Sequence, residues 1–173
     1  MIQTIVYTSN TGFTEKYAKL LAEKIKLPVY SLNDAAAVPP GTEIIYLGWL
    51  MASGVKGYKK ASRRYKVQAV CGVGMGATGL QLPEVRKQNA IPESIPVFTM
   101  QGGFDMTRLH GIYKMMMSVM RKTAGKALEK KQDKTAEEAE MLDMMINGKD
   151  CVSLENLAAV IRWYEEKQGY KQI

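Results

Sequence analysis

Hydroxyl-bearing residues are concentrated in one short segment, directly after the first apolar run of the chain. The run Ile2–Tyr7 is followed by a helical pattern, and between them stand Thr8, Ser9, Asn10, Thr11, Gly12, Phe13 and Thr14. Hydroxyls and backbone N–H groups at the positive end of a helix suit a phosphate group. Gly12 would let the backbone approach closely, and no lysine or arginine is needed. The segment predicts a phosphate-binding loop, with simple capping of the helix as the alternative.

Elements that alternate along the chain must position this loop. Five apolar, β-rich runs are each followed by a turn or a helical pattern: Ile2–Tyr7, Val29–Leu32, Glu43–Trp49, Val67–Val73 and Ile95–Met100. This alternation predicts an α/β domain with a mostly parallel sheet, and the length of 173 residues suits a single domain over residues 1–173. Ser153 is expected to cap a closing helix. Ligands of such sheets bind beyond the carboxyl ends of the strands, so functional residues are expected there.

The loop carries a recognisable pattern. Residues Ser9–Thr14 read Ser-x-Thr-Gly-x-Thr at the first strand-helix junction, and this resembles the phosphate loop of the flavodoxin superfamily. The resemblance implies a flavodoxin-like fold, a doubly wound five-stranded parallel sheet with helices on both faces. It also implies FMN held without covalent attachment, and electron transfer with a redox partner protein or a small-molecule substrate.

Two further loops are expected near the FMN ring. The resemblance places Gly48, Trp49, Leu50, Met51 and Ala52 over one face of the ring, with Trp49 or Leu50 stacking on it; core burial of Trp49 is the alternative. It places a second set, Val73, Gly74, Met75 and Gly76, beside the ring. Gly74, Gly76 and Gly79 spell GxGxxG, but Leu80–Pro83 follows where a dinucleotide fingerprint would open a helix. A flexible loop is the alternative for these glycines.

Basic residues are concentrated in the second half of the chain. The net charge is +7, and residues 105–134 hold eight Lys/Arg against three Asp/Glu. A helical pattern in this segment places Leu109, Ile112, Tyr113, Met116, Met117 and Met120 on one side. Such a methionine stripe is more often core than surface, although methionine also suits adaptable binding surfaces. The basic helix 105–134 is a candidate contact for an anionic partner or a membrane surface.

The layout as a whole resembles the branch of the superfamily that includes flavodoxin-type protoporphyrinogen oxidases. In that branch FMN passes electrons from a porphyrinogen to a respiratory quinone at the membrane, and Asp105–Lys134 occupies the place of its insertion. Carrier flavodoxins are typically acidic, whereas this chain is basic. Three functions therefore stay open: an FMN redox protein, a quinone-linked oxidase of this kind, and a non-redox module that binds phosphate ligands or anionic surfaces.

Other classes are disfavoured by composition. No apolar run reaches the roughly 20 residues of a membrane span, and the N-terminus lacks the charged and apolar regions of a secretory signal, so a cytoplasmic protein is expected, with peripheral membrane attachment as the alternative. Cys71 and Cys151 form no disulfide or zinc pattern. The basic runs lack the interleaved aromatics of nucleic-acid binders, so no nucleic acid is expected. His110 is the one histidine and is more often an exposed helix residue than an acid-base catalyst in such a place. No catalytic residue is assigned.

Overall fold

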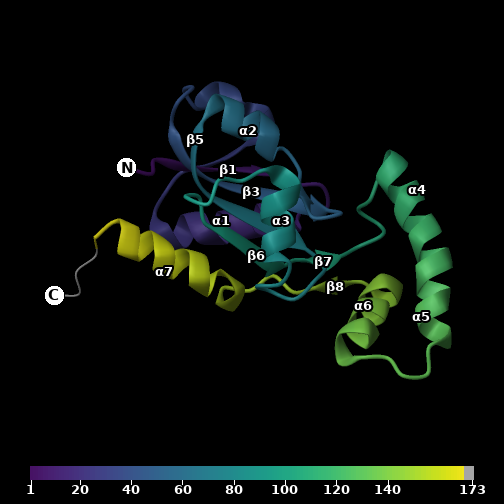
Figure 1. The fold of residues 1–173 in the computed structure, drawn as a ribbon. Helices are drawn as coiled ribbons and strands as arrows, with labels where there is room; N and C mark the ends of the chain where they lie inside the picture. The colour runs from purple at the N-terminus through teal and green to yellow at the C-terminus, as the bar shows by residue number, and fades with distance from the viewer. Residues whose placement is uncertain (170–173) are drawn as a thin grey trace.

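Five parallel strands form the centre of the computed structural model, which describes residues 1–169 (Figure 1). Their order is β2-β1-β3-β5-β6, and a short β4 (Gly54–Val55) pairs antiparallel with the end of β3. The strand bounds are β1 (Thr4–Thr8), β2 (Val29–Ser31), β3 (Glu43–Met51), β5 (Lys66–Gly74) and β6 (Val97–Gln101). The expected α/β architecture with a mostly parallel sheet is confirmed. The last four residues of the expected 1–173 domain lie outside the described residues.

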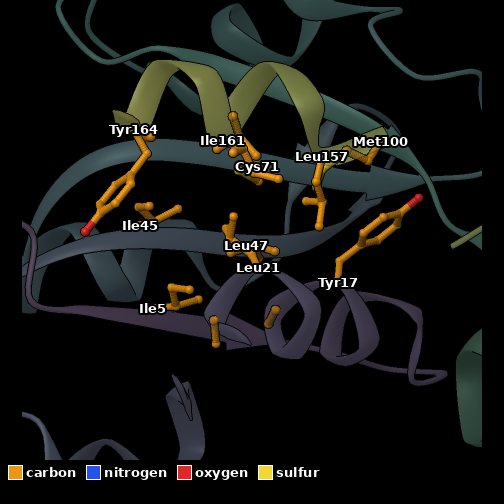
Figure 2. Packing of buried hydrophobic residues seen from close by; sticks show 14 of the residues in the cluster. Ile5, Tyr17, Leu21, Ile45, Leu47, Cys71, Met100, Leu157, Ile161 and Tyr164 are labelled. Carbon is orange, nitrogen blue, oxygen red and sulfur yellow. The ribbon is translucent and has the colours of Figure 1, made fainter. Parts of the chain in front are cut away.

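Helices α1 (Phe13–Ile25) and α7 (Ala158–Lys167) cover one face of the sheet. Tyr17 and Leu21 of α1 and Ile161 of α7 pack on the strands in the cluster that Figure 2 shows. The strand residues in this layer include Ile45 and Leu47, both fully buried. This layer holds the start of α1, and with it the expected phosphate loop, against the carboxyl end of β1.

Helices α2 (Tyr58–Arg64) and α3 (Leu82–Asn89) cover the other face, together with the 3-10 helix η1 (Leu32–Ala37). Side chains alternate along a strand, so Ile44 and Tyr46 point into this layer while their neighbours Ile45 and Leu47 point into the first. Both faces of the sheet are therefore buried. This explains why the strands read as continuous apolar runs in the sequence.

Between β6 and α7 the chain makes a long excursion (Figure 1). Its two ends meet as an antiparallel ribbon of β7 and β8, and the N–H of Cys151 donates to the carbonyl of Gly102 (2.8 Å). We call residues 105–148 the insertion. In Figure 1, α4 and α5 form one rod that stands apart from the sheet, and α6 returns beside it. The bounds are β7 (Gly103–Phe104), α4 (Gly111–Met120), the π-helical turn η2 (Arg121–Gly125), α5 (Lys126–Lys130), α6 (Ala136–Asn147) and β8 (Lys149–Asp150).

The expectation that the methionine stripe of α4 is core is wrong for most of its length. Leu109 is buried and Tyr113 and Met117 are half-buried, but Ile112 is 62% and Met116 46% exposed. A helical period identifies an apolar face, but it does not say whether another element covers that face.

None of the described helices is long and apolar enough to cross a lipid bilayer.

Two helix starts differ from expectation. Helix α6 was not expected, although its start has a capping box in which the Glu138 N–H donates to Thr135 Oγ1 (3.1 Å) and the Thr135 N–H donates to Glu138 Oε2 (3.0 Å). Such a Thr-x-x-Glu pattern is visible in a sequence. Ser153 accepts the N–H of Asn156 (3.3 Å) and so caps the 3-10 turn η3 (Glu155–Leu157) rather than α7 itself.

Candidate functional site

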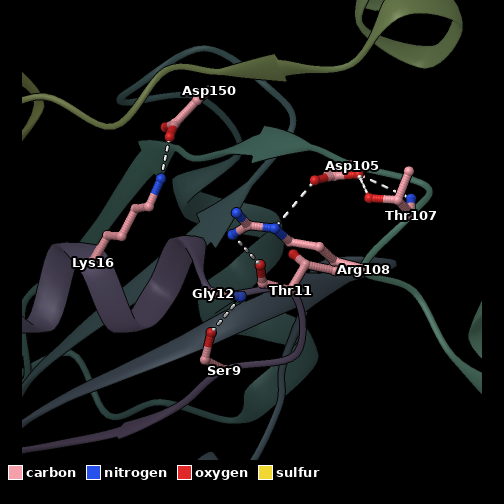
Figure 3. Close-up of polar contacts among 8 residues, drawn as sticks. All are labelled: Ser9, Thr11, Gly12, Lys16, Asp105, Thr107, Arg108 and Asp150. Carbon is pink, nitrogen blue, oxygen red and sulfur yellow. Dashed lines mark hydrogen bonds and ion pairs between the residues drawn. The ribbon is translucent and has the colours of Figure 1, made fainter.

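The segment Thr8–Thr14 forms a tight loop between β1 and α1 (Figure 3). Gly12 has a left-handed backbone (φ +96°), and its N–H donates to Ser9 Oγ (3.1 Å). The first helical N–H bond comes from Lys16, to the carbonyl of Gly12 (3.0 Å), and no side chain caps the start of this helix. The N–H groups of the first turn therefore lack helical partners and point to the place where a phosphate would bind. Ser9 closes the loop but does not cap α1.

Thr8, at the end of β1, is held in place by a hydrogen bond with Tyr46 of β3. The hydroxyl of Tyr46 lies 2.8 Å from Thr8 Oγ1 and 2.7 Å from the carbonyl of Lys56. Because a carbonyl only accepts, the tyrosine donates to Lys56 and accepts from Thr8. Burial raises the pKa of Tyr46, and the hydrogen bond with Thr8 lowers it in part. A Cβ at Gly57 would come within 2.5 Å of Thr8 Oγ1, so the position of this hydroxyl also requires glycine there. Thr8 thus anchors the loop.

The segment Gly48–Ala52 is not the open loop that was expected. β3 continues through Met51 and turns back at Ala52 and Ser53, both with positive φ, so that Leu50 pairs with Val55. The side chain of Leu50 lies over β5, where a Cβ at Gly72 would approach it to 2.8 Å. Leu50 therefore fills space above glycines, which sequence spacing did not reveal, and it packs with the α2 and α3 layer.

Trp49 points to the opposite side and is half-buried. Its ring makes an edge-to-face contact with Tyr113 of α4 (centroids 5.1 Å apart, 89° between planes), and the ammonium of Lys56 lies 5.6 Å from its centroid. Core burial of Trp49 is not what the structure shows. An aromatic side chain at this sheet edge, partly open and flanked by a second ring, is suited to contact a planar ligand.

The glycine segment after β5 is divided between the sheet and the insertion. Val73 is buried in the core, and the carbonyl of Gly74 accepts the N–H of Gly102 (2.8 Å). Met75 packs against the small cluster formed by Phe104, Leu109 and Met144, while Gly76 has open space around it. α3 begins at Leu82, three residues after Gly79, so the GxGxxG does not open a helix, as expected.

Strand register brings the three expected segments to one edge of the sheet. Thr8 pairs with Gly48, Trp49 pairs with Val73, and Val73 pairs with Met100. The ends of β1, β3, β5 and β6 therefore lie side by side. The insertion starts from the same edge, because it follows β6 directly.

The insertion contributes residues to this edge that the sequence did not identify. Arg108 donates from Nη1 to the carbonyl of Thr11 (3.3 Å), and its Nε lies 3.2 Å from Asp105 Oδ2 (Figure 3). Tyr113 reaches Trp49 from the next helix. The sequence signal was only that both residues follow a strand whose carboxyl end lies at this edge.

One ion pair connects the ribbon to the start of α1, and another connects it to α6. Lys16 pairs with Asp150, and Lys149 with Glu140 (2.7 Å). The hydroxyl and N–H of Thr107, followed by the nearby Arg108, hold the pKa of Asp105 below its usual value. Apart from Glu140, these residues line an open hollow between the first turn of α1 and the ribbon, together with Phe13 and Phe104.

The donor set fits the phosphate of a flavin mononucleotide. Unpartnered helical N–H groups, the hydroxyls of the half-buried Ser9 and Thr11, and a glycine whose φ an L side chain rarely adopts lie together in this loop. Thr14, which was expected to join them, is buried in the first turn of α1 (2% exposed). No group of three His, Cys, Asp or Glu side chains that could hold a metal ion occurs among residues 1–169. His110 is exposed at the start of α4. The arrangement brings unpartnered N–H groups, hydroxyls and a partly open aromatic ring to one edge of the sheet.

Comparisons of the chain with models of protein families, with curated proteins and with solved structures found no match.

Proposed function

We propose that this chain is a flavodoxin-like, doubly wound protein that binds FMN without covalent attachment and transfers electrons between a reduced donor or small substrate and an acceptor. The observation that carries the proposal is the uncapped start of α1 behind Gly12, next to the strand end that presents Trp49. The strand order β2-β1-β3-β5-β6 supports it, because doubly wound sheets of this order place their ligand between the ends of β1 and β3. Burial of both faces of the sheet supports the doubly wound assignment.

Different residues would bind the phosphate and the ring of the cofactor. The first-turn N–H groups of α1 and the hydroxyls of Ser9 and Thr11 would hold the phosphate. Trp49 and the backbone at Gly74–Gly76 would border the ring and exclude water from it. When bound, FMN supplies the hydride and one-electron chemistry. The titratable side chains at this edge are engaged in ion pairs, Lys16 with Asp150 and Arg108 with Asp105, so we assign the protein the roles of binding, orientation and desolvation.

Titration with FMN tests the proposal directly. We expect purified protein to bind FMN with perturbed visible bands that bleach with dithionite. Thr11→Asp should abolish binding, because it places a carboxylate in the loop, whereas Thr123→Asp, at an exposed position on the insertion, should not. A protein that binds no FMN overturns the proposal. Binding of other phosphorylated ligands by a colourless protein would favour the non-redox alternative.

A second candidate is the quinone-linked, protoporphyrinogen-oxidase-like enzyme, which works at a membrane surface. The insertion favours it: Ile112, Met115 and Val119 of α4 are 62%, 63% and 56% exposed, and Lys114 and Arg121 are exposed on the same rod. Apolar side chains flanked by cations suit an anionic lipid surface, where the apolar groups enter the headgroup boundary.

Vesicle co-sedimentation and turnover test this candidate together. We expect binding to phosphatidylglycerol-containing vesicles but not to neutral phosphatidylcholine vesicles, and quinone-dependent oxidation of protoporphyrinogen by the FMN-loaded protein. Met115→Glu should lose vesicle binding, while Leu80→Glu, at a comparably exposed site on the sheet domain, should keep it. Absence of turnover with both soluble and vesicle-bound quinones would reject the enzyme assignment.

A further inference from the structure

The base of the insertion is built directly on the start of α1. A Cβ at Gly103 would lie 2.9 Å from Phe13 Cε1 and 2.1 Å from the carbonyl of Lys149, so the ribbon packs on the first residue of the helix. Asp150 of the ribbon pairs with Lys16 in the next turn. The insertion is therefore attached at the phosphate loop, and its first residues must pass close to any ligand bound there.

The guanidinium of Arg108 contacts the loop backbone directly. Its Nη1 contacts the Thr11 carbonyl at 3.3 Å, and a Cβ at Gly12 would also lie 3.3 Å from this nitrogen. Lys16 and Lys149 are each paired with a carboxylate from the ribbon or from α6. Two contacts occupy two of the five N–H donors of an arginine, and the side chain is 52% exposed. Its other donors are open to an anion that arrives from solvent.

A purely structural role accounts poorly for this arrangement. The Arg108–Asp105 pair is three residues apart and half-exposed, and such pairs contribute little to folding. The contact with Thr11 is long for a charged donor, whereas a phosphate oxygen is a much stronger acceptor for a guanidinium. An anion in the loop would therefore compete well for Arg108.

The geometry points to Arg108 as a phosphate ligand supplied by the insertion. When FMN binds, the guanidinium exchanges the Thr11 carbonyl and Asp105 for the cofactor phosphate. Occupancy of the loop then ties the insertion to the start of α1. Asp105 acts as the competing anion that holds Arg108 in the free protein. This inference rests on the proposed function, and it adds a third kind of donor, beside backbone N–H groups and hydroxyls, to a loop that by its own residues needs no cation.

Comparison of FMN with riboflavin, which lacks the phosphate, isolates this role. We expect Arg108→Gln to weaken FMN binding about tenfold and to leave riboflavin binding unchanged, since the lost contact is one charged hydrogen-bonding group at a half-exposed site. Asp105→Asn should strengthen FMN binding about two- to fivefold, again without effect on riboflavin. Arg121→Gln, on the same insertion but away from the loop, is the matched control and should change neither affinity.

The outcomes separate this inference from the proposed function. Equal losses for FMN and riboflavin in Arg108→Gln, or no loss for either, would overturn the role of Arg108 while leaving FMN binding intact. Wild-type protein that binds neither flavin would overturn both. A second measurement tests whether bound FMN fixes the insertion to the start of α1 through Arg108. FMN should slow tryptic cleavage within residues 114–134 in the wild type but not in Arg108→Gln. Equal protection in both proteins would contradict the exchange.

Discussion

The rings of Trp49 and Tyr113 meet edge to face, 5.1 Å apart, and so connect the end of β3 to the first turn of α4. They are 64 positions apart in the sequence, and one belongs to the sheet while the other belongs to the insertion. Since the rest of the α4 face is largely exposed, this contact is one of the few that orient the rod. Removal of this contact should therefore change the exposure of Trp49 at the sheet edge where we place the cofactor ring.

Tyr113→Ala should uncover Trp49. In a Trp163→Phe background, where Trp49 is the sole tryptophan, we expect the emission maximum to shift to longer wavelength and quenching by iodide to increase. The lost edge-to-face contact is worth about 0.5–1.5 kcal/mol. Tyr113→Phe keeps the ring and should behave as the wild type. An unchanged spectrum in Tyr113→Ala would mean that α4 does not shield Trp49 in solution.

Gly12→Ala should damage both stability and ligand binding. A left-handed φ costs a residue with a Cβ about 1–2 kcal/mol, and the methyl group would also crowd Arg108. Gly41→Ala is the matched control, because Gly41 has φ +81° with no neighbour around its Cβ position. Urea unfolding should show similar losses for both variants, while only Gly12→Ala should lose FMN affinity. Equal FMN affinities would argue against this loop as the phosphate site.

Tyr46→Phe should loosen the start of the phosphate loop. It removes a buried hydroxyl that bridges Thr8 and the carbonyl of Lys56, at a cost of about 1 kcal/mol in the free energy of unfolding. We expect a lower urea midpoint and weaker FMN binding. Tyr30→Phe, in the half-buried strand β2, serves as the control for loss of a tyrosine hydroxyl elsewhere. A Tyr46→Phe protein with unchanged stability would contradict the bridging role.

Tyr17→Phe should weaken the attachment of the insertion. The Tyr17 hydroxyl donates to the carbonyl of Gln101 (2.5 Å) and accepts from Asn156 Nδ2 (2.8 Å), so it ties α1 to the end of β6 and to η3. We expect a loss of about 1 kcal/mol or more, since the partners lie partly buried and lose their bond. Amide exchange in the β7 and β8 ribbon should accelerate. Exchange that changes equally across the whole chain would instead indicate only global destabilisation.

Alkaline pH should destabilise the protein through Cys71. Burial raises the pKa of this thiol well above its ordinary value, whereas in the unfolded chain it titrates near about 8.5. Above that pH the unfolded state binds fewer protons than the folded state, so the free energy of unfolding falls as pH rises. Cys71→Ala should flatten this fall by at most about 1.4 kcal/mol per pH unit. Burial also raises the pKa of the half-buried Cys151, so Cys151→Ala should flatten the fall less than Cys71→Ala does, and equal slopes in both would refute the assignment.

Much of the fold could be predicted because local patterns coincide with buried strands. All five parallel strands lie within two residues of the expected bounds, since both faces of the sheet are buried and each strand reads as an apolar run. The junction of β1 and α1 could be located for a similar reason, because its hydroxyls, Gly12 and the helix start are consecutive in the chain. That it binds a phosphate stays a prediction. Helix α6 could have been found from Thr135 and Glu138.

The remaining parts of the candidate site depend on residues far apart in the chain. Trp49 or Leu50 was expected over a ring, but the turn at Ala52 and Ser53 and the glycines of β5 place Leu50, half-buried, over β5. The methionine stripe was read as core, but the insertion leaves the sheet and exposes most of it. The spacing of residues along one element predicts neither the position of Leu50 nor the exposure of the methionine stripe. Each depends on whether a second element packs against that side chain.

By itself, then, the sequence determined the alternation of strands and helices, the hydroxyl-rich junction at Thr8–Thr14 and the basic, methionine-rich segment, since each is a property of neighbouring residues. Only the tertiary structure decided that Arg108 stands over Thr11 and that Tyr113 meets Trp49. Strand order and register set these encounters: they place the ends of β1, β3 and β6 at one edge, from which the insertion must start. Contacts between such distant residues are set by packing and chain direction, and no local pattern records them.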